Sequence, residues 1–188
     1  SHLSSYIKMD AGEKIIQAYL LSSFDESVEV LCASRFGMIK RTNLKELQVS
    51  RSNKTMVCMK IGSLDEMVSV ALSYSPDDVV ILSSEQGFAL SYPVDQVPQV
   101  SCRSKGVKAI NLVKDDHVAD MIVVSNLDGQ LVVISDTAQM KRIKASDIAQ
   151  VKRPAKGNRI CKLVKSNPVK IDRLLSKQLN DVIEFQHD

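Results

Sequence analysis

The sequence predicts an all-β fold, a propeller-like array of four-stranded antiparallel blades with about 51 residues per repeat. Three observations carry this prediction: short β-branched runs bounded by turn-forming residues, the lack of long amphipathic helical patterns, and landmarks that recur at one period. The chain has 188 residues, 44% hydrophobic and 25% charged, which is enough for a sizeable core and excludes a disordered or fibrous class. No apolar run approaches the roughly 20 residues of a membrane span, so no membrane partner is expected.

The candidate strands are short runs rich in Val, Ile, Leu and Met, separated by Asp, Ser, Asn, Gly or Pro. In chain order they are Val28–Cys32, Gly37–Thr42, Met56–Ile61, Met67–Leu72, Val79–Leu82, Met121–Val124, Leu131–Ile134 and Val182–Phe185. Two further segments, Asn43–Leu47 and Ala145–Ile148, are predicted to form single helical turns between strands.

Four sets of landmarks share one period, which indicates a tandem repeat. The sets are Glu26, Asp77 and Asp128; Lys54, Lys105 and Lys156; Asp65, Asp116 and Asn167; and Gly37, Gly87 and Gln139. We therefore expect one domain over 1–188, a fragment of a larger subunit, with approximate repeats 14–64, 65–115, 116–166 and a partial repeat 167–188. A unit of this size cannot bury its own faces, so neighbouring units must pack together as blades.

The four cysteines have no ligand spacing typical of zinc and no nearby histidine pair, so neither a metal nor a cofactor is expected. Cys32, Cys58 and Cys161 lie in apolar strand-like runs and are predicted to be buried thiols in a reducing cytoplasm. Cys102 has polar neighbours and is expected to be more exposed. The recurring turn acids are predicted to be structural, because Asp and Asn satisfy backbone groups in tight turns.

Charge is unevenly distributed along the chain. Residues 1–100 hold 9 Lys and Arg against 12 Asp and Glu, whereas residues 101–188 hold 16 against 10. Between Gln139 and Lys165 there are nine basic residues and one acid, Asp147. Such clustering indicates either a solvated face or a polyanionic partner.

The recurring Lys favours a polyanionic partner, because no packing argument requires a cation at one position of successive blades. Cations set in a curved row would suit the regularly spaced phosphates of a bent duplex. We therefore predict binding to double-stranded DNA without sequence specificity. The candidate DNA-binding residues are Lys40, Arg41, Arg51, Lys54, Arg103, Lys105, Lys108, Lys141, Arg142, Lys152, Arg153, Lys156 and Arg159.

Three segments, Gly37–Thr42, Lys105–Leu112 and Arg153–Gly157, carry a resemblance to the C-terminal repeats of bacterial type IIA topoisomerase A subunits. The resemblance covers the chain from about Tyr6 onward. It implies a β-pinwheel, whose blades exchange strands with their neighbours, and a basic outer rim that binds and bends duplex DNA. Ser101–Gly106 and Lys152–Gly157 are only degenerate versions of the gyrase heptad Gln-Arg-Arg-Gly-Gly-Lys-Gly, so the topoisomerase IV type is favoured over gyrase.

The resemblance also implies partners and a location. The expected partners are the N-terminal catalytic core of the same subunit and the separate ATPase subunit, in a cytoplasmic, nucleoid-associated enzyme that decatenates and relaxes DNA. Strand cleavage in this family belongs to a tyrosine in another region, and no segment here resembles it. The domain itself is therefore expected to carry no catalytic residues, although its parent is an ATP-dependent type IIA topoisomerase.

Enzymatic motifs are missing from the sequence: there is no P-loop, no G-x-S-x-G and no H-E-x-x-H. The alternative from another class is a propeller-like scaffold for protein–protein interaction. Scaffolds of the WD or kelch type share the repeat length but carry Trp-Asp or Gly-Gly signatures, and this chain has no Trp.

Overall fold

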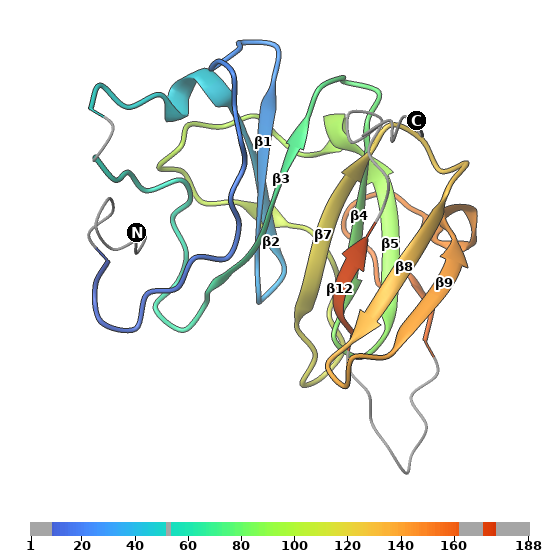
Figure 1. Cartoon of the computed structure of the whole chain (residues 1–188). Coiled ribbons are helices and arrows are strands. Elements are labelled where there is room, and N and C mark those ends of the chain that lie inside the picture. Colours follow the sequence, from blue (N-terminus) through green and yellow to red (C-terminus); the bar gives the residue numbers. More distant parts are fainter. Residues whose placement is uncertain (1–8, 52–53, 162–170, 176–188) are drawn as a thin grey trace, which may run out of the picture.

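The computed structural model of the chain describes residues 9–51, 54–161 and 171–175, which form three antiparallel hairpins set side by side (Figure 1). The hairpins are β1 (Glu29–Ser34) with β2 (Met38–Asn43), β4 (Val79–Ser84) with β5 (Phe88–Pro93), and β8 (Gln130–Ser135) with β9 (Met140–Lys144). We name the sheets built on them blades 1, 2 and 3. In the described part of the chain no helix has the length and apolarity to cross a membrane.

The hairpin turns repeat one design. In the first two, a glycine with positive φ, Gly37 (+87°) or Gly87 (+91°), precedes the second strand. In the third, Ala138 adopts φ of +59° and donates its N–H to the Ser135 carbonyl, just as Gly37 and Gly87 bond Ser34 and Ser84. Ala138 is thus the structural counterpart of Gly37 and Gly87. The prediction that Gln139 occupies this position was wrong by one residue.

Each blade is completed by strands from later repeats. The third strands β3 (Met67–Ser73), β7 (Val118–Val124) and β12 (Ile171–Leu175) pair with β1, β4 and β8, respectively. The outer strands β6 (Val107–Lys108) and β11 (Asn158–Arg159) pair with β2 and β5, which also adjoins the parallel strand β10 (Ala149–Gln150). This exchange of strands confirms the predicted all-β pinwheel.

The core lies between the blades. One apolar cluster joins Leu31 and Ile39 of blade 1 to Leu82 and Leu90 of blade 2, and all four side chains are fully buried. A second cluster joins blades 2 and 3 around Ile81, Leu131 and Ile148. Burial of aliphatic surface between blades supplies the main stabilisation, because a single sheet would leave both faces in water.

The predicted helical turns are confirmed as short 3-10 turns, η2 (Leu44–Leu47) and η4 (Ala145–Asp147), and η3 (Val94–Gln96) is a third. The strand predicted over Met56–Ile61 was wrong: this segment is irregular. It corresponds to β6 and β11, each of which pairs with the hairpin of the previous blade. Among the described residues no blade precedes blade 1, so the segment has no strand to pair with. The predicted strand Val182–Phe185 and Asn167 lie outside the described residues.

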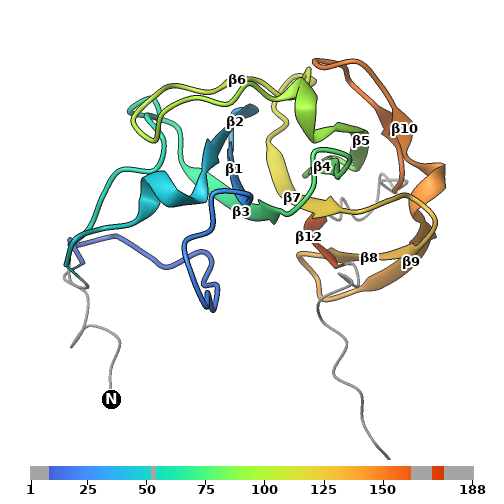
Figure 2. The ribbon, with the colours of Figure 1, turned by 90° about the horizontal axis from the view of Figure 1, so that it is seen from above.

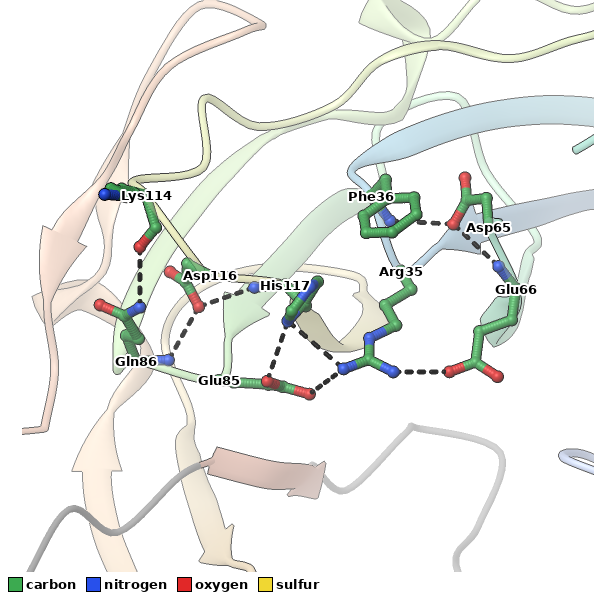
Figure 3. Close-up of polar contacts among 9 residues, drawn as sticks. All are labelled: Arg35, Phe36, Asp65, Glu66, Glu85, Gln86, Lys114, Asp116 and His117. Carbon is green, nitrogen blue, oxygen red and sulfur yellow. Dashed lines mark hydrogen bonds and ion pairs between the residues drawn. The ribbon is translucent and has the colours of Figure 1, made fainter. Parts of the chain in front are cut away.

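The recurring acids hold the hairpin turns, as Figure 3 shows. Asp65 accepts hydrogen bonds from the N–H groups of Phe36 (3.0 Å) and Glu66 (2.9 Å). Asp116 repeats this arrangement with Gln86 (3.0 Å) and His117 (2.9 Å). The carboxylates therefore satisfy backbone groups, as the sequence predicts for structural turn acids.

A polar cluster links the first two blades next to these turns (Figure 3). The Arg35 guanidinium lies 3.1 Å from the Glu66 carboxylate and 3.8 Å from that of Glu85. The Nδ1 of His117 lies 3.2 Å from Glu85 and 3.4 Å from Arg35. These contacts join hairpin turns and strand starts, so they set how blade 2 sits against blade 1.

Candidate nucleic-acid interface

Three connections carry the recurring lysines, and they run along one side of the molecule. They cover residues 48–51 with 54–61, 97–112 and 149–160, and in Figure 2 they follow one another along the side that faces away from β12. Lys54, Lys105 and Lys156 occupy one position in these connections, and all three are exposed. The repeat therefore spaces three cations along one curved surface.

Glycine follows the second and third of these lysines because the connection passes against the backbone of the preceding blade. A Cβ on Gly106 would lie 2.5 Å from the Ile39 carbonyl oxygen, and one on Gly157 would lie 2.0 Å from that of Ala89. Real Cβ atoms do not approach so closely, so only glycine fits. The matching residue of the first connection is Thr55, at a place where no described strand lies alongside.

A second cation follows each glycine by two residues. Lys108 of β6 pairs with Met38, and Arg159 of β11 pairs with Phe88 at the same place one repeat later. The Phe88 ring lies 4.6 Å from Lys156 Nζ and 4.5 Å from Arg159 Cζ, so both cations pack over its faces. Phe88 holds this pair in place while leaving both residues exposed.

A basic groove of about 480 Å³ lies between β9 and β11. Its lining includes Lys141, Arg142, Lys144 and Arg159 against one acid, Asp147. Lys144 was not among the predicted site residues, although it lies two positions after Arg142, and strand residues two apart share a face. Period-two spacing in β9 is the signal that could have found it.

Two predicted site residues, Arg41 and Arg153, are half-buried and bind the backbone. Arg41 Nε donates to the Val97 carbonyl at 2.9 Å. Arg153 donates from Nε to the Gln96 carbonyl (2.9 Å) and from a terminal nitrogen to that of Lys108 (2.7 Å). These guanidinium groups fasten connections to each other, so their main contribution is structural.

Lys40 requires a correction, because its side chain is fully buried. Its Nζ donates to the carbonyls of Ser101 (2.8 Å) and Cys102 (2.6 Å), and burial lowers its pKa. The second connection crosses over β2 and covers Lys40. The equivalent Lys141 remains exposed, although its Nζ donates to the Ile160 carbonyl of the third connection at 3.1 Å. Lys40 is therefore not part of the candidate interface.

The ten other predicted residues are exposed. They are Arg51, Lys54, Arg103, Lys105, Lys108, Lys141, Arg142, Lys152, Lys156 and Arg159. Their cations lie on the connections and on β6, β9 and β11, and residues of β9 and β11 line one groove. Within the described residues, no cluster of three or more His, Cys, Asp or Glu side chains could hold a metal ion.

Exchanged strands, repeated hairpins and basic connections define the chain as a propeller-like repeat domain of the pinwheel type. The family model described as "DNA gyrase C-terminal domain, beta-propeller" matches residues 29–72, 78–125 and 129–165. The chain belongs to this family of C-terminal domains. The three matched segments each begin at or near the first strand of a hairpin, so the family repeat coincides with the hairpins.

Among characterised relatives, the chain is similar to the DNA topoisomerase 4 subunits A of Staphylococcus epidermidis and Bacillus subtilis. It is 27% identical to the first over 170 residues, 90% of this chain and 21% of that protein. For the second the identity is 27% over 175 residues, 93% of this chain and 22% of that protein. The chain thus spans about a fifth of the length of these relatives.

A solved structure described as the C-terminal domain of DNA topoisomerase IV matches with a TM-score of 0.85 and 27% identity. The match covers 95% of this chain and 55% of that one. A DNA gyrase A C-terminal domain matches with a TM-score of 0.60 at 13% identity, which supports the fold alone. The resemblance found in the sequence is confirmed at the level of the family and of its topoisomerase IV branch.

Proposed function

We propose that this domain binds duplex DNA without sequence specificity through the cations of its connections, and that it bends the duplex along the blades. The observation that carries the proposal is the recurrence of Lys54, Lys105 and Lys156 at one exposed position, on connections that follow each other along one side. A single cation of this kind would be an ordinary surface residue. Three in a row match a polymer of phosphates.

The mechanism is electrostatic. Lys and Arg that contact phosphates displace condensed counterions, so affinity falls steeply as salt rises and varies little with sequence. Lys156 and Arg159 suit this role because Phe88 restrains both, which lowers the entropy that ordering would cost on binding. Smooth bending of about 20 to 30 base pairs costs about 1 to 6 kcal/mol, which contacts on several blades must offset.

In the cell we assign this domain to a type IIA topoisomerase of the topoisomerase IV kind, cytoplasmic and associated with the nucleoid. Its partners there are the catalytic core of the same subunit and the ATPase subunit. The similarity to topoisomerase 4 subunits A over most of this chain supports the assignment. The domain holds DNA for an active site that lies elsewhere in that enzyme.

Fluorescence anisotropy with a labelled duplex of about 30 base pairs tests the proposal. We expect binding at low salt that weakens as salt rises and is equal for duplexes of unrelated sequence. Absence of binding at low salt would favour the alternative, a scaffold for protein–protein interaction. Closer fluorophores on the two duplex ends, measured by energy transfer, would support bending, and an unchanged end-to-end distance would contradict it.

A further inference from the structure

Two cysteines meet on the face of blade 1 that points away from blade 2. Cys32 lies in β1 and is 1% exposed, whereas Cys58 lies on the first connection and is partly exposed. Both belong to the apolar cluster that includes Val30, Leu44 and Met59. Cys58 packs against the cluster that holds Cys32, and a hydrogen-bond interaction between the two side chains shifts the pKa of each thiol. The prediction that Cys58 is a buried thiol within a strand was wrong.

The surroundings of the pair make the two thiols unequal. The hydrogen bond with Cys32 lowers the pKa of Cys58 to about 6, and the nearby Lys40 ammonium acts in the same direction. That hydrogen bond and burial raise the pKa of Cys32. Lys40 stands opposite Cys32 in the β1–β2 ladder. Cys58 is therefore both the more exposed and the more acidic thiol of the pair, and a lowered pKa favours the thiolate, the reactive form of cysteine.

Blade 2 indicates that packing does not require this chemistry. The residues that correspond to Cys32, Lys40 and Cys58 one repeat later are Leu82 and Leu90 of blade 2 and Ala109 of the second connection. All three are fully buried apolar residues of the cluster between blades 1 and 2. The fold is thus satisfied by apolar side chains at these positions. Blade 1 has instead two thiols and a buried ammonium group.

We propose that Cys58 and Cys32 form a peroxide-reactive dithiol that closes to a disulfide. The Cys58 thiolate attacks one oxygen of a hydroperoxide, the S–O bond forms as the O–O bond breaks, and hydroxide or alkoxide leaves. The Cys32 sulfur then attacks the Cys58 sulfur, the S–S bond forms as the S–O bond breaks, and the sulfenic hydroxyl leaves as water with the Cys32 proton. Two thiols are oxidised and one peroxide is reduced.

The disulfide would fasten the first connection to β1. Cys58 lies in irregular backbone, which can adjust to the geometry that a disulfide requires. Lys60, two residues on, donates its N–H to the Ser104 carbonyl at 3.2 Å. The bond would therefore form beside the second connection. The dithiol does not depend on the proposed binding of DNA.

The test uses the 188-residue chain with Cys102 and Cys161 replaced by Ser, which leaves the pair as its only cysteines. After treatment with hydrogen peroxide at pH 7, intact mass spectrometry should show the loss of two hydrogen atoms, and peptide mapping should join Cys58 to Cys32. In the same background, Cys32→Ser should yield a sulfenic acid at Cys58 that a cyclic dione traps. Cys58→Ser should leave the buried Cys32 unmodified.

A second measurement covers the possibility that a variant perturbs the fold. Cys32→Ala removes the hydrogen bond, so the alkylation rate of Cys58 by iodoacetamide should fall about fourfold at pH 7 and keep rising at alkaline pH. Circular dichroism checks that this variant is folded. Peroxide that leaves the pair reduced, or that modifies Cys58 without joining it to Cys32, would overturn the proposal. An alkylation profile unchanged by Cys32→Ala would also overturn it.

Discussion

The Asp116 carboxylate accepts a hydrogen bond from the N–H of Gln86 at 3.0 Å, across 30 residues of chain. Gln86 lies in the turn of one hairpin, and Asp116 precedes β7, the third strand of the same sheet. Asp65 holds Phe36 in the same way in blade 1. The recurring acid thus marks the point where each exchanged strand is fixed to the blade it completes.

Replacement of Asp65 should therefore destabilise blade 1. Asp65→Ala leaves the N–H groups of Phe36 and Glu66 without their acceptor and should lower the free energy of unfolding by about 1 to 2 kcal/mol. Asp65→Asn keeps an acceptor oxygen and should cost less. Urea denaturation measures both, with Asp95→Ala, an exposed acid, as the control. Equal stabilities for all three variants would contradict the role of Asp65.

The glycine of the third connection should not tolerate a side chain. Gly157→Ala places a Cβ 2.0 Å from the Ala89 carbonyl oxygen at φ of +79°, so we expect a loss of at least about 2 kcal/mol of stability. Gly129→Ala is the matched control, because nothing lies within 4 Å of its Cβ, and it should change stability by less than about 0.5 kcal/mol. Thermal denaturation measures both variants. Similar losses of stability for Gly157→Ala and Gly129→Ala would contradict the close approach of Gly157 to the Ala89 carbonyl.

The third hairpin has an alanine where the others have glycine. Ala138 holds φ of +59°, a conformation that costs an L-residue about 1 kcal/mol. Ala138→Gly should therefore raise the free energy of unfolding by up to about 1 kcal/mol, measured by urea denaturation. Ala18→Gly, an exposed site outside the strands, should be neutral or slightly destabilising. A loss of stability in Ala138→Gly would contradict the turn geometry.

Arg153 and Lys156 should separate stability from binding. Arg153→Gln removes hydrogen bonds to the carbonyls of Gln96 and Lys108 and should lower the stability by about 1 to 3 kcal/mol. Lys156→Gln should leave stability within about 0.5 kcal/mol but weaken duplex binding, since its ammonium is exposed. Denaturation and anisotropy on both variants test this. A loss of stability in Lys156→Gln, or an unchanged stability in Arg153→Gln, would contradict these roles.

Much of the fold was predictable because repetition reinforces weak local signals. The two strands on either side of Gly37 and the helical turn at Leu44 followed from turn residues and β-branched runs alone, whereas β5 after Gly87 was not predicted. The strand expected at Met56–Ile61 failed for a reason outside that segment. An outer strand forms only where the preceding blade has an edge strand to pair with. The sequence of the segment itself contains no information about whether that edge strand is present.

The candidate site was predictable where the repeat decides exposure and not where tertiary contacts do. Lys54, Lys105 and Lys156 share one position and are all exposed. Lys40 and Lys141 also share one position, yet the second connection buries Lys40, whereas Lys141 remains exposed. The residues next to Lys40 do not indicate that its ammonium binds the carbonyls of Ser101 and Cys102, which lie about 60 residues further along the chain.

The salt dependence of duplex binding tests the central claim most directly. The logarithm of the association constant should fall linearly with the logarithm of salt concentration, with a slope of about −0.9 per phosphate contact. Charge reversal to Glu at Lys54, Lys105 and Lys156 should weaken binding and make the slope shallower by about 3. A control with the same charge change, Lys14→Glu, Lys45→Glu and Lys114→Glu, uses exposed lysines outside that recurring position and should keep most of the slope. Equal slopes for the two triple variants would contradict the account.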